Sequence, residues 1–139
     1  MSMDCAAATD AGRKRKRNED ACLCEPDIGL FLVADGMGGD AAGGFASAEA
    51  VRVIGEQVRE LHEALLTLSH DGETWQVHAV LETALQDAND AIWQRGEKSG
   101  ELNGMGTTSS LLWIWGHEPP SRMWETPACT SFVTANSTE

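Results

Sequence analysis

The feature that most constrains this chain is a short apolar run that stops at an aspartate and passes directly into a glycine-rich segment. Residues 29–34 are almost wholly apolar, Asp35 follows them, and residues 36–44 contain five glycines. Short apolar runs bounded by turn-forming residues are typical of buried strands. The sequence therefore predicts a strand that turns sharply into the segment after it.

Two long helices are predicted beyond this turn. Apolar residues recur at three- and four-residue steps up to residue 68 and again over 75–98, which is the pattern of amphipathic helices. Asp71 and Gly72 mark the loop between them, and Pro26 with Asp27 predicts a hairpin that joins a strand at 21–24 to the apolar run. A further short strand is expected at residues 6–9.

The balance of charge limits the partners of this chain. Lys and Arg number 10 against 22 Asp and Glu, which gives a formal charge of −12. An acidic surface repels phosphate backbones, so we expect no nucleic-acid partner. No apolar run reaches the roughly 18 residues of a membrane span, and the N-terminus lacks the pattern of a secretory signal. We therefore expect a cytoplasmic protein without a membrane partner.

The cysteines give little indication of a metal site or a disulfide framework. They show no paired C-x-x-C spacing, and a lone C-x-C pair is a weak metal signal. We expect reduced thiols at all four positions, Cys5, Cys22, Cys24 and Cys129.

Three carboxylates are the candidate metal ligands. Asp35 ends the apolar strand, and Glu19 and Asp20 stand at the start of the neighbouring strand. Carboxylates brought to one sheet end from two strands can hold hard divalent cations such as Mg²⁺ or Mn²⁺. Gly36 would let the main chain come close enough for a carbonyl oxygen to join them. The alternative is that Asp35 caps the turn and that the other two are solvated.

Two further motifs invite a phosphate interpretation. The glycine loop resembles the dinucleotide-binding fingerprint, but Ala41 stands where its third glycine would be. Residues 13–17 are five consecutive cations. Such a run is usually a solvated loop, but this one ends beside the candidate carboxylates, where one arginine could bind a substrate phosphate.

These motifs together resemble the N-terminal motifs of the bacterial metal-dependent protein phosphatases, the type 2C or PPM family. The resemblance runs from residue 6 to Thr108 through four motifs in order: Thr9-Asp10-Ala11-Gly12 to Asn18-Glu19-Asp20, Ala34-Asp35-Gly36-Met37-Gly38-Gly39, Ala41-Ala42-Gly43 with Ala46-Ser47, and Gly104-Met105-Gly106-Thr107-Thr108. It implies an α+β fold, the N-terminal part of an α-β-β-α sandwich of two packed antiparallel sheets flanked by helix pairs. It also implies hydrolysis of phosphoserine or phosphothreonine in protein substrates by a hydroxide activated by two Mn²⁺ or Mg²⁺ ions.

The resemblance also implies a role for each matching residue. Asp35 would bridge both metals, Gly36 would supply a carbonyl oxygen, and Glu19 and Asp20 would hold metal directly or through water. Arg15 would bind the substrate phosphate. The chain departs from the family pattern at three positions, two of which commonly carry histidine and one an acidic residue: Met37, Asp40 and Gly44.

The largest departure is the missing second half of the family's sequence. We interpret residues 1–108 as the N-terminal part of a phosphatase domain and residues 109–139 as an out-of-frame tail, because prolines and tryptophans crowd the latter. Read one base out of frame with permitted codons, the tail contains Val-Gly-Asp-Ser-Arg, whose Val-Gly is forced by Met123 and Trp124. The sequence thus predicts a truncated, inactive phosphatase. The alternatives are a non-catalytic metal- or partner-binding fragment and a dinucleotide-binding module.

Overall fold

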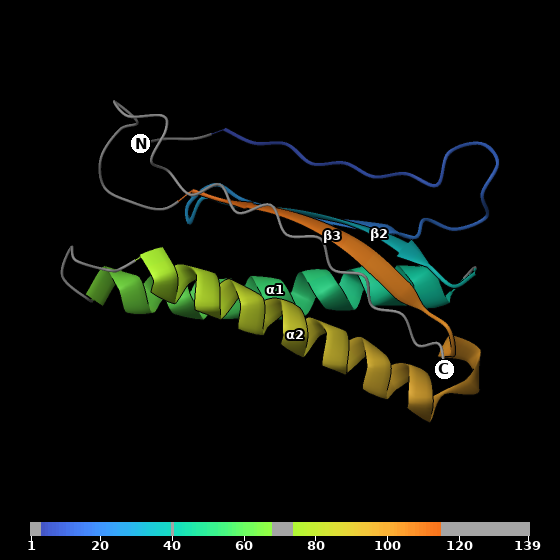
Figure 1. Cartoon of the computed structure of the whole chain (residues 1–139). Coiled ribbons are helices and arrows are strands. Elements are labelled where there is room, and N and C mark those ends of the chain that lie inside the picture. The colour runs from blue at the N-terminus through green and yellow to red at the C-terminus, as the bar shows by residue number, and fades with distance from the viewer. Residues whose placement is uncertain (1–3, 40, 68–73, 115–139) are drawn as a thin grey trace.

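The computed structural model describes residues 4–39, 41–67 and 74–114, and shows an α+β arrangement of one sheet and two long helices. The sheet has three antiparallel strands in the order β1-β2-β3. Both helices lie on the same side of it (Figure 1). The strands are β1 (Asp20–Glu25), β2 (Leu30–Met37) and β3 (Gly106–Trp113), and the helices are α1 (Ala42–Thr67) and α2 (Thr74–Lys98), with a short 3₁₀ turn, η1 (Gly100–Leu102), before β3.

The hairpin and the two strands predicted around Pro26 are confirmed, but β2 continues beyond Asp35 to Met37 because residues 36 and 37 still pair with β3. The Gly29 amide donates to the Pro26 carbonyl at 3.2 Å, and Gly29 has a φ of 69°. A side chain at Gly29 would in addition collide with the Ile114 backbone. Glycine therefore satisfies both the turn conformation and the close approach of the chain beyond β3.

The sheet is buried on one face only. Alternate residues of β2 face the helices and are buried, namely Leu30, Leu32 and Ala34, whereas Val33 on the other face is 58% exposed. Leu112 of β3 is 39% exposed on the same outer face. This alternation follows from the two-residue period of a strand, and it leaves an apolar outer face on which no second sheet lies among the described residues.

The two predicted helices are confirmed and form one layer. Their buried positions follow the predicted stripes, and Leu30, Leu32, Ile54, Val58, Ile92 and Trp113 contribute large side chains to the core. The Gln57 side-chain amide of α1 donates to the Asp87 carboxylate of α2 at 2.5 Å. None of the helices in the described ranges is long and apolar enough to cross a membrane.

Strand β3 extends beyond Thr108 into the segment that we interpret as an out-of-frame tail. It continues from Thr108 to Trp113, pairs with β2 over this whole length, and buries Ser109, Leu111 and Trp113. The Trp113 indole N–H donates to the Ile28 carbonyl at 2.9 Å. Residues 109–113, interpreted from the sequence as the start of an out-of-frame tail, therefore belong to the sheet, and the Ser109 hydroxyl is buried there without a hydrogen-bond partner among the described residues. Residues 115–139 lie outside the described residues.

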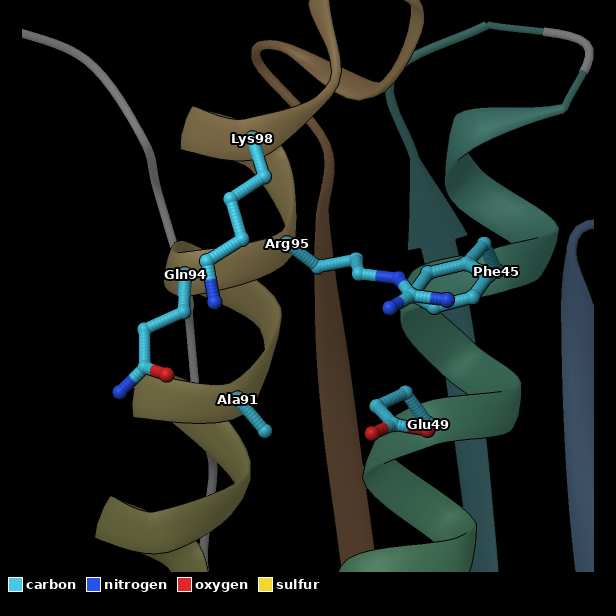
Figure 2. A pocket seen from close by; sticks show the side chains of 6 residues that line it. All are labelled: Phe45, Glu49, Ala91, Gln94, Arg95 and Lys98. Carbon is cyan, nitrogen blue, oxygen red and sulfur yellow. The ribbon is translucent and has the colours of Figure 1, made fainter.

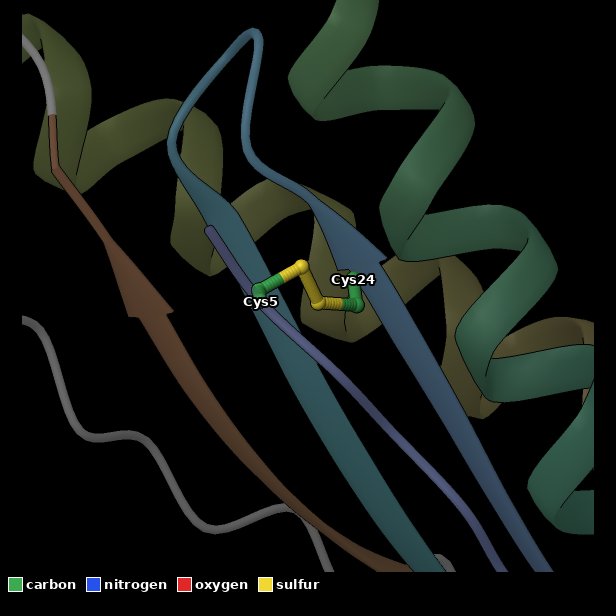
Figure 3. Close-up of a disulfide and its surroundings, with 2 residues drawn as sticks. All are labelled: Cys5 and Cys24. Carbon is green, nitrogen blue, oxygen red and sulfur yellow. A yellow bond between two sulfur atoms is a disulfide. The ribbon is translucent and has the colours of Figure 1, made fainter. Parts of the chain in front are cut away.

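The N-terminal segment corrects two expectations. Residues 6–9 form no strand. Residues near the N-terminus cross the sheet on the side away from the helices (Figure 1). Figure 3 shows Cys5 of this segment joined to Cys24 of β1 in a disulfide, with Cα atoms 6.5 Å apart. The expectation of reduced thiols was wrong for this pair because the fold brings them within disulfide reach, whereas Cys22 is a free thiol.

Candidate metal centre

The ends of β1 and β2 bring two predicted ligands face to face. Asp20 is the register partner of Asp35. The Gly36 amide donates to the Glu19 carbonyl at 3.0 Å, which extends the pairing one step beyond β1. Asp20 and Asp35 both lie on the outer side of the sheet and are exposed. Two carboxylates and the Gly36 backbone therefore meet at one end of the sheet.

Glu19 lies on the other side of the sheet. Its Oε1 atom is 2.9 Å from the point where a Cβ of Gly43 would stand, so its side chain contacts the first turn of α1. In the described part of the chain, no three His, Cys, Asp or Glu side chains come close enough together to hold a metal ion. The strand alternation separates the Glu19 side chain from those of the two aspartates, which lie on the outer side of the sheet.

Thr107 is a residue that the sequence reasoning did not single out. It is fully buried on β3, and its Oγ1 atom lies 2.9 Å from the Asp35 carbonyl oxygen and 3.0 Å from the Thr108 carbonyl oxygen. Donation to the Asp35 carbonyl fixes the backbone that carries the candidate carboxylate. The sequence feature that could have indicated this role is the pair of threonines, Thr107 and Thr108, at the end of the last of the four motifs.

Close backbone contact fixes the start of α1 against this end of the sheet. A Cβ atom on Gly36 would overlap the Gly43 carbonyl, and the Ala42 amide donates to the Gly39 carbonyl at 2.9 Å. Gly38 and Gly39 have φ values of 129° and 86°, which glycine adopts readily. The glycine loop thus forms a tight strand-to-helix connection, and the first turn of the helix lies against the Gly36 backbone and the Glu19 side chain.

Arg15 lies beside this end of the sheet as well. Its Nη1 atom is 3.9 Å from Glu19 Oε2, and its side chain is 63% exposed. Asn18 joins the loop to the site, because its Nδ2 group donates to Thr9 Oγ1 at 2.9 Å and its Oδ1 accepts from the Asp20 amide at 3.2 Å. Sequence reasoning missed these roles of Thr9 and Asn18.

Two of the three departures from the family pattern, Met37 and Gly44, lie next to the site. Met37 is 43% exposed on the outer face of β2. A Cβ on Gly44 would lie 3.0 Å from the Asn18 carbonyl oxygen, so any side chain there would press on the loop before β1. Asp40 lies outside the described residues.

A shallow groove of about 320 Å³ occupies the helix layer, apart from these residues. Figure 2 shows Arg95 of α2 reaching across to Phe45 of α1, with its guanidinium carbon 5.4 Å from the ring centroid. The lining residues are Phe45, Glu49, Ala91, Gln94, Arg95 and Lys98. None of them belongs to the carboxylate end of the sheet.

Known proteins resemble this chain in both sequence and fold. A family model described as Protein phosphatase 2C matches residues 9–122. The serine/threonine phosphatase stp of Listeria monocytogenes is 41% identical over 103 residues, covering 72% of this chain and 38% of that protein. PstP of Mycobacterium tuberculosis is 34% identical over 112 residues, covering 81% of this chain and 19% of that protein.

Solved structures agree with this match. The crystal structure of the Mycobacterium tuberculosis phosphatase PstP/Ppp has a TM-score of 0.65 at 32% identity, over 80% of this chain and 42% of that one. PppA of Pseudomonas aeruginosa has a TM-score of 0.58 at 33% identity, over 78% and 42% respectively. The chain thus spans about two fifths or less of the length of these relatives.

Proposed function

Because the chain belongs to the protein phosphatase 2C family, we propose that it carries the N-terminal part of a metal-dependent serine/threonine phosphatase site. The observation that supports this most directly is the register pairing of Asp20 with Asp35 beside the Gly36 backbone. The proposed substrates are proteins phosphorylated on serine or threonine, and the proposed cofactors are Mn²⁺ or Mg²⁺.

The donor set fits such an ion in its chemistry. Asp35, Asp20 and the Gly36 carbonyl offer oxygen atoms, which hard divalent cations prefer, and both carboxylates are open to solvent. Glu19, on the opposite side, would act through water. Bound divalent ions would supply positive charge that activates water and neutralises the phosphoryl oxygens.

Arg15 is the proposed phosphate-binding residue. Its guanidinium is largely exposed and lies 3.9 Å from Glu19, a long contact that leaves its donors available. A planar guanidinium can bind two phosphate oxygens at once. Arg15 would therefore orient the substrate, while the aspartates hold the metal.

The chain as written is proposed to be inactive. It spans about two fifths or less of its relatives' length, and its outer sheet face exposes Val33 and Leu112. We infer that the rest of a two-sheet sandwich covers this face in a complete enzyme and supplies further metal ligands. A single lost base near the Thr108 codon would account for the missing part, and resequencing the DNA tests this directly. Losing part of a two-metal site removes the positioning on which phosphoryl transfer depends.

We do not propose dinucleotide binding by the glycine loop. Ala41 occupies the place of the third glycine of that fingerprint, and the family match includes the loop. Titration with NAD is expected to show no binding.

Mn²⁺ binding tests the metal site without requiring activity. Isothermal titration calorimetry of the full chain is expected to detect weak binding that Asp35→Asn abolishes. The matched control is Asp27→Asn, which removes an exposed aspartate from the turn at the other end of β1 and β2. Binding that survives Asp35→Asn, or that both substitutions reduce equally, would contradict the proposed site.

Activity is tested by comparing two proteins on a phosphothreonine peptide with Mn²⁺. One is the chain as written. The other is encoded by the gene with one base restored after the Thr108 codon, and it includes the downstream sequence. We expect phosphate release only from the second. Equal activity in both would refute the inactivity of this chain, and inactivity in both would refute the assignment to a working phosphatase.

A further inference from the structure

The sequence run Arg13 to Arg17 forms an exposed loop that the proposed mechanism uses at one position only. All five residues are exposed, and they are half of the 10 Lys and Arg residues of the chain. Without them the remaining residues would carry five cations against 22 carboxylates. This loop, called the basic loop below, is thus the main concentration of positive charge in a strongly acidic chain.

The basic loop is closed at its neck. The Thr9 and Asn18 side chains hydrogen-bond to each other at 2.9 Å across nine residues, and the Gly12 amide donates to Asp10 Oδ1 at 2.7 Å. Asn18 also accepts from the Asp20 amide, which ties the neck to the first residue of β1. In Figure 1 the loop lies at the end of the sheet where β2 finishes. The neck therefore holds the cations beside the candidate metal centre.

The cations of the loop are largely unpaired. In the described ranges, Arg15 is the only one of the five with a carboxylate within 4.0 Å, at 3.9 Å. Arg13 and Arg17 are each two residues from Arg15, at most about 7 Å along the chain. That backbone separation is shorter than the Debye length of about 10 Å at moderate ionic strength, so neighbouring cations of the loop contribute to the electrostatic potential at Arg15.

We propose that the basic loop selects phosphopeptides that carry acidic residues next to the phosphorylated residue. This inference rests on the proposed function for the place of the phosphate at Arg15. Lys14, Lys16 and the outer arginines would meet carboxylates on either side of it, and guanidinium groups bind carboxylates through paired hydrogen bonds. The loop offsets the repulsion that a chain of charge −12 exerts on an anionic substrate.

The charge distribution favours an acidic peptide over a nucleic acid. A peptide with a few carboxylates matches a patch of five residues. A nucleic acid would extend its phosphates over the neighbouring acidic surface, where repulsion lowers affinity.

The test measures binding to the full chain by fluorescence anisotropy at low salt. The probes are a phosphothreonine peptide with acidic flanks, the same peptide with neutral flanks, and the acidic peptide without phosphate. The test variant is Lys14→Ser/Lys16→Ser, which keeps Arg15. The matched control is Arg95→Gln/Lys98→Gln, which removes the same charge from the helix layer shown in Figure 2. Circular dichroism checks that both variants fold.

We expect acidic flanks to tighten binding about fivefold in the parent chain and in the helix-layer control, because each exposed charge pair contributes modestly. The loop variant is expected to lose most of this preference. A preference that both variants keep, or that both lose equally, would overturn the proposal. The proposal would also be overturned if a single-stranded oligonucleotide of equal charge bound more tightly than the acidic phosphopeptide and if its binding depended on the loop lysines.

The same measurements separate this proposal from the proposed function. Equal affinity for the phosphorylated and unphosphorylated acidic peptides would refute the phosphate role of Arg15. A loop-dependent preference for acidic over neutral flanks that persists in that case would still support selection of acidic peptides by the loop.

Discussion

The backbones of Gly36 and Gly43 cross so closely that a Cβ atom on Gly36 would overlap the Gly43 carbonyl group. Gly36 ends the buried face of β2 beside the candidate carboxylate Asp35, and Gly43 lies in the first turn of α1. This contact places the helix N-terminus against the candidate metal centre. Two small residues at one crossing therefore decide how the sheet and the helix layer meet.

Gly36→Ala is expected to destabilise the chain by about 3 kcal/mol or more, because the overlap involves backbone atoms that cannot rotate away. Urea unfolding followed by circular dichroism measures this. Gly100→Ala is the control, since a Cβ there meets nothing within 4 Å. It should change stability by less than about 1 kcal/mol, and similar losses in the two variants would contradict the close contact.

Cys5→Ser is expected to lower the free energy of unfolding by up to about 3 kcal/mol, because the disulfide with Cys24 closes a loop in the unfolded chain. Unfolding with and without a reducing agent measures the effect. Cys22→Ser removes the free thiol of the same strand and serves as the control. Under reducing conditions the parent chain and Cys5→Ser should be equally stable, because neither then contains the disulfide. A remaining difference in stability between them would show that the substitution acts through another contact.

Because the pKa of the Glu49 carboxylate is lowered in the folded chain, we expect the free energy of unfolding to depend on pH. The hydrogen bonds from Arg52, at 2.9 and 2.7 Å, are the main reason that the pKa of Glu49 lies below its usual value, and the charges of Arg52 and Arg95 act in the same direction against burial. Because the folded-state pKa is lowered, the stabilisation is complete above the unfolded-state pKa. It is lost as the pH falls through the folded-state value.

Unfolding measured between neutral pH and about pH 3 should show a smaller loss of stability in Glu49→Gln than in the parent chain. Glu60→Gln is the control, as its carboxylate is exposed on the same helix and forms no ion pair in the described ranges. An unchanged acid response in Glu49→Gln would contradict the prediction.

The ion pair between Glu25 and Arg59 joins β1 to α1. Arg59 Nε lies 2.9 and 3.0 Å from the two carboxylate oxygens, its Nη2 also contacts Glu25, and the hydrogen bond raises the pKa of Arg59. Because Arg59 remains 43% exposed, Glu25→Gln should cost only about 1 kcal/mol. Glu63→Gln, an exposed carboxylate of α1, should cost less in the same unfolding measurement. A smaller loss from Glu25→Gln than from Glu63→Gln would contradict the stabilising role.

Local pattern was sufficient to predict the two helices and the hairpin of β1 and β2. The steps between apolar residues such as Ile54 and Val58 predicted α1, and the run that ends at Asp35 predicted β2. Both patterns follow from the geometry of a single element, so neither needs knowledge of its neighbours. Strand β3 was not predicted, because the alternation of its buried residues becomes evident only in its pairing with β2.

The motifs of the sequence by themselves determined the family and the set of candidate residues, since residue types and their spacing are properties of the chain alone. Only the tertiary structure decided which of those residues meet. Strand register placed Asp20 opposite Asp35, and alternation turned Glu19 to the helix side. Contacts far apart in the sequence also joined Cys5 to Cys24 and closed the basic loop through Thr9 and Asn18. These pairings depend on how separate elements pack, and no local periodicity encodes them.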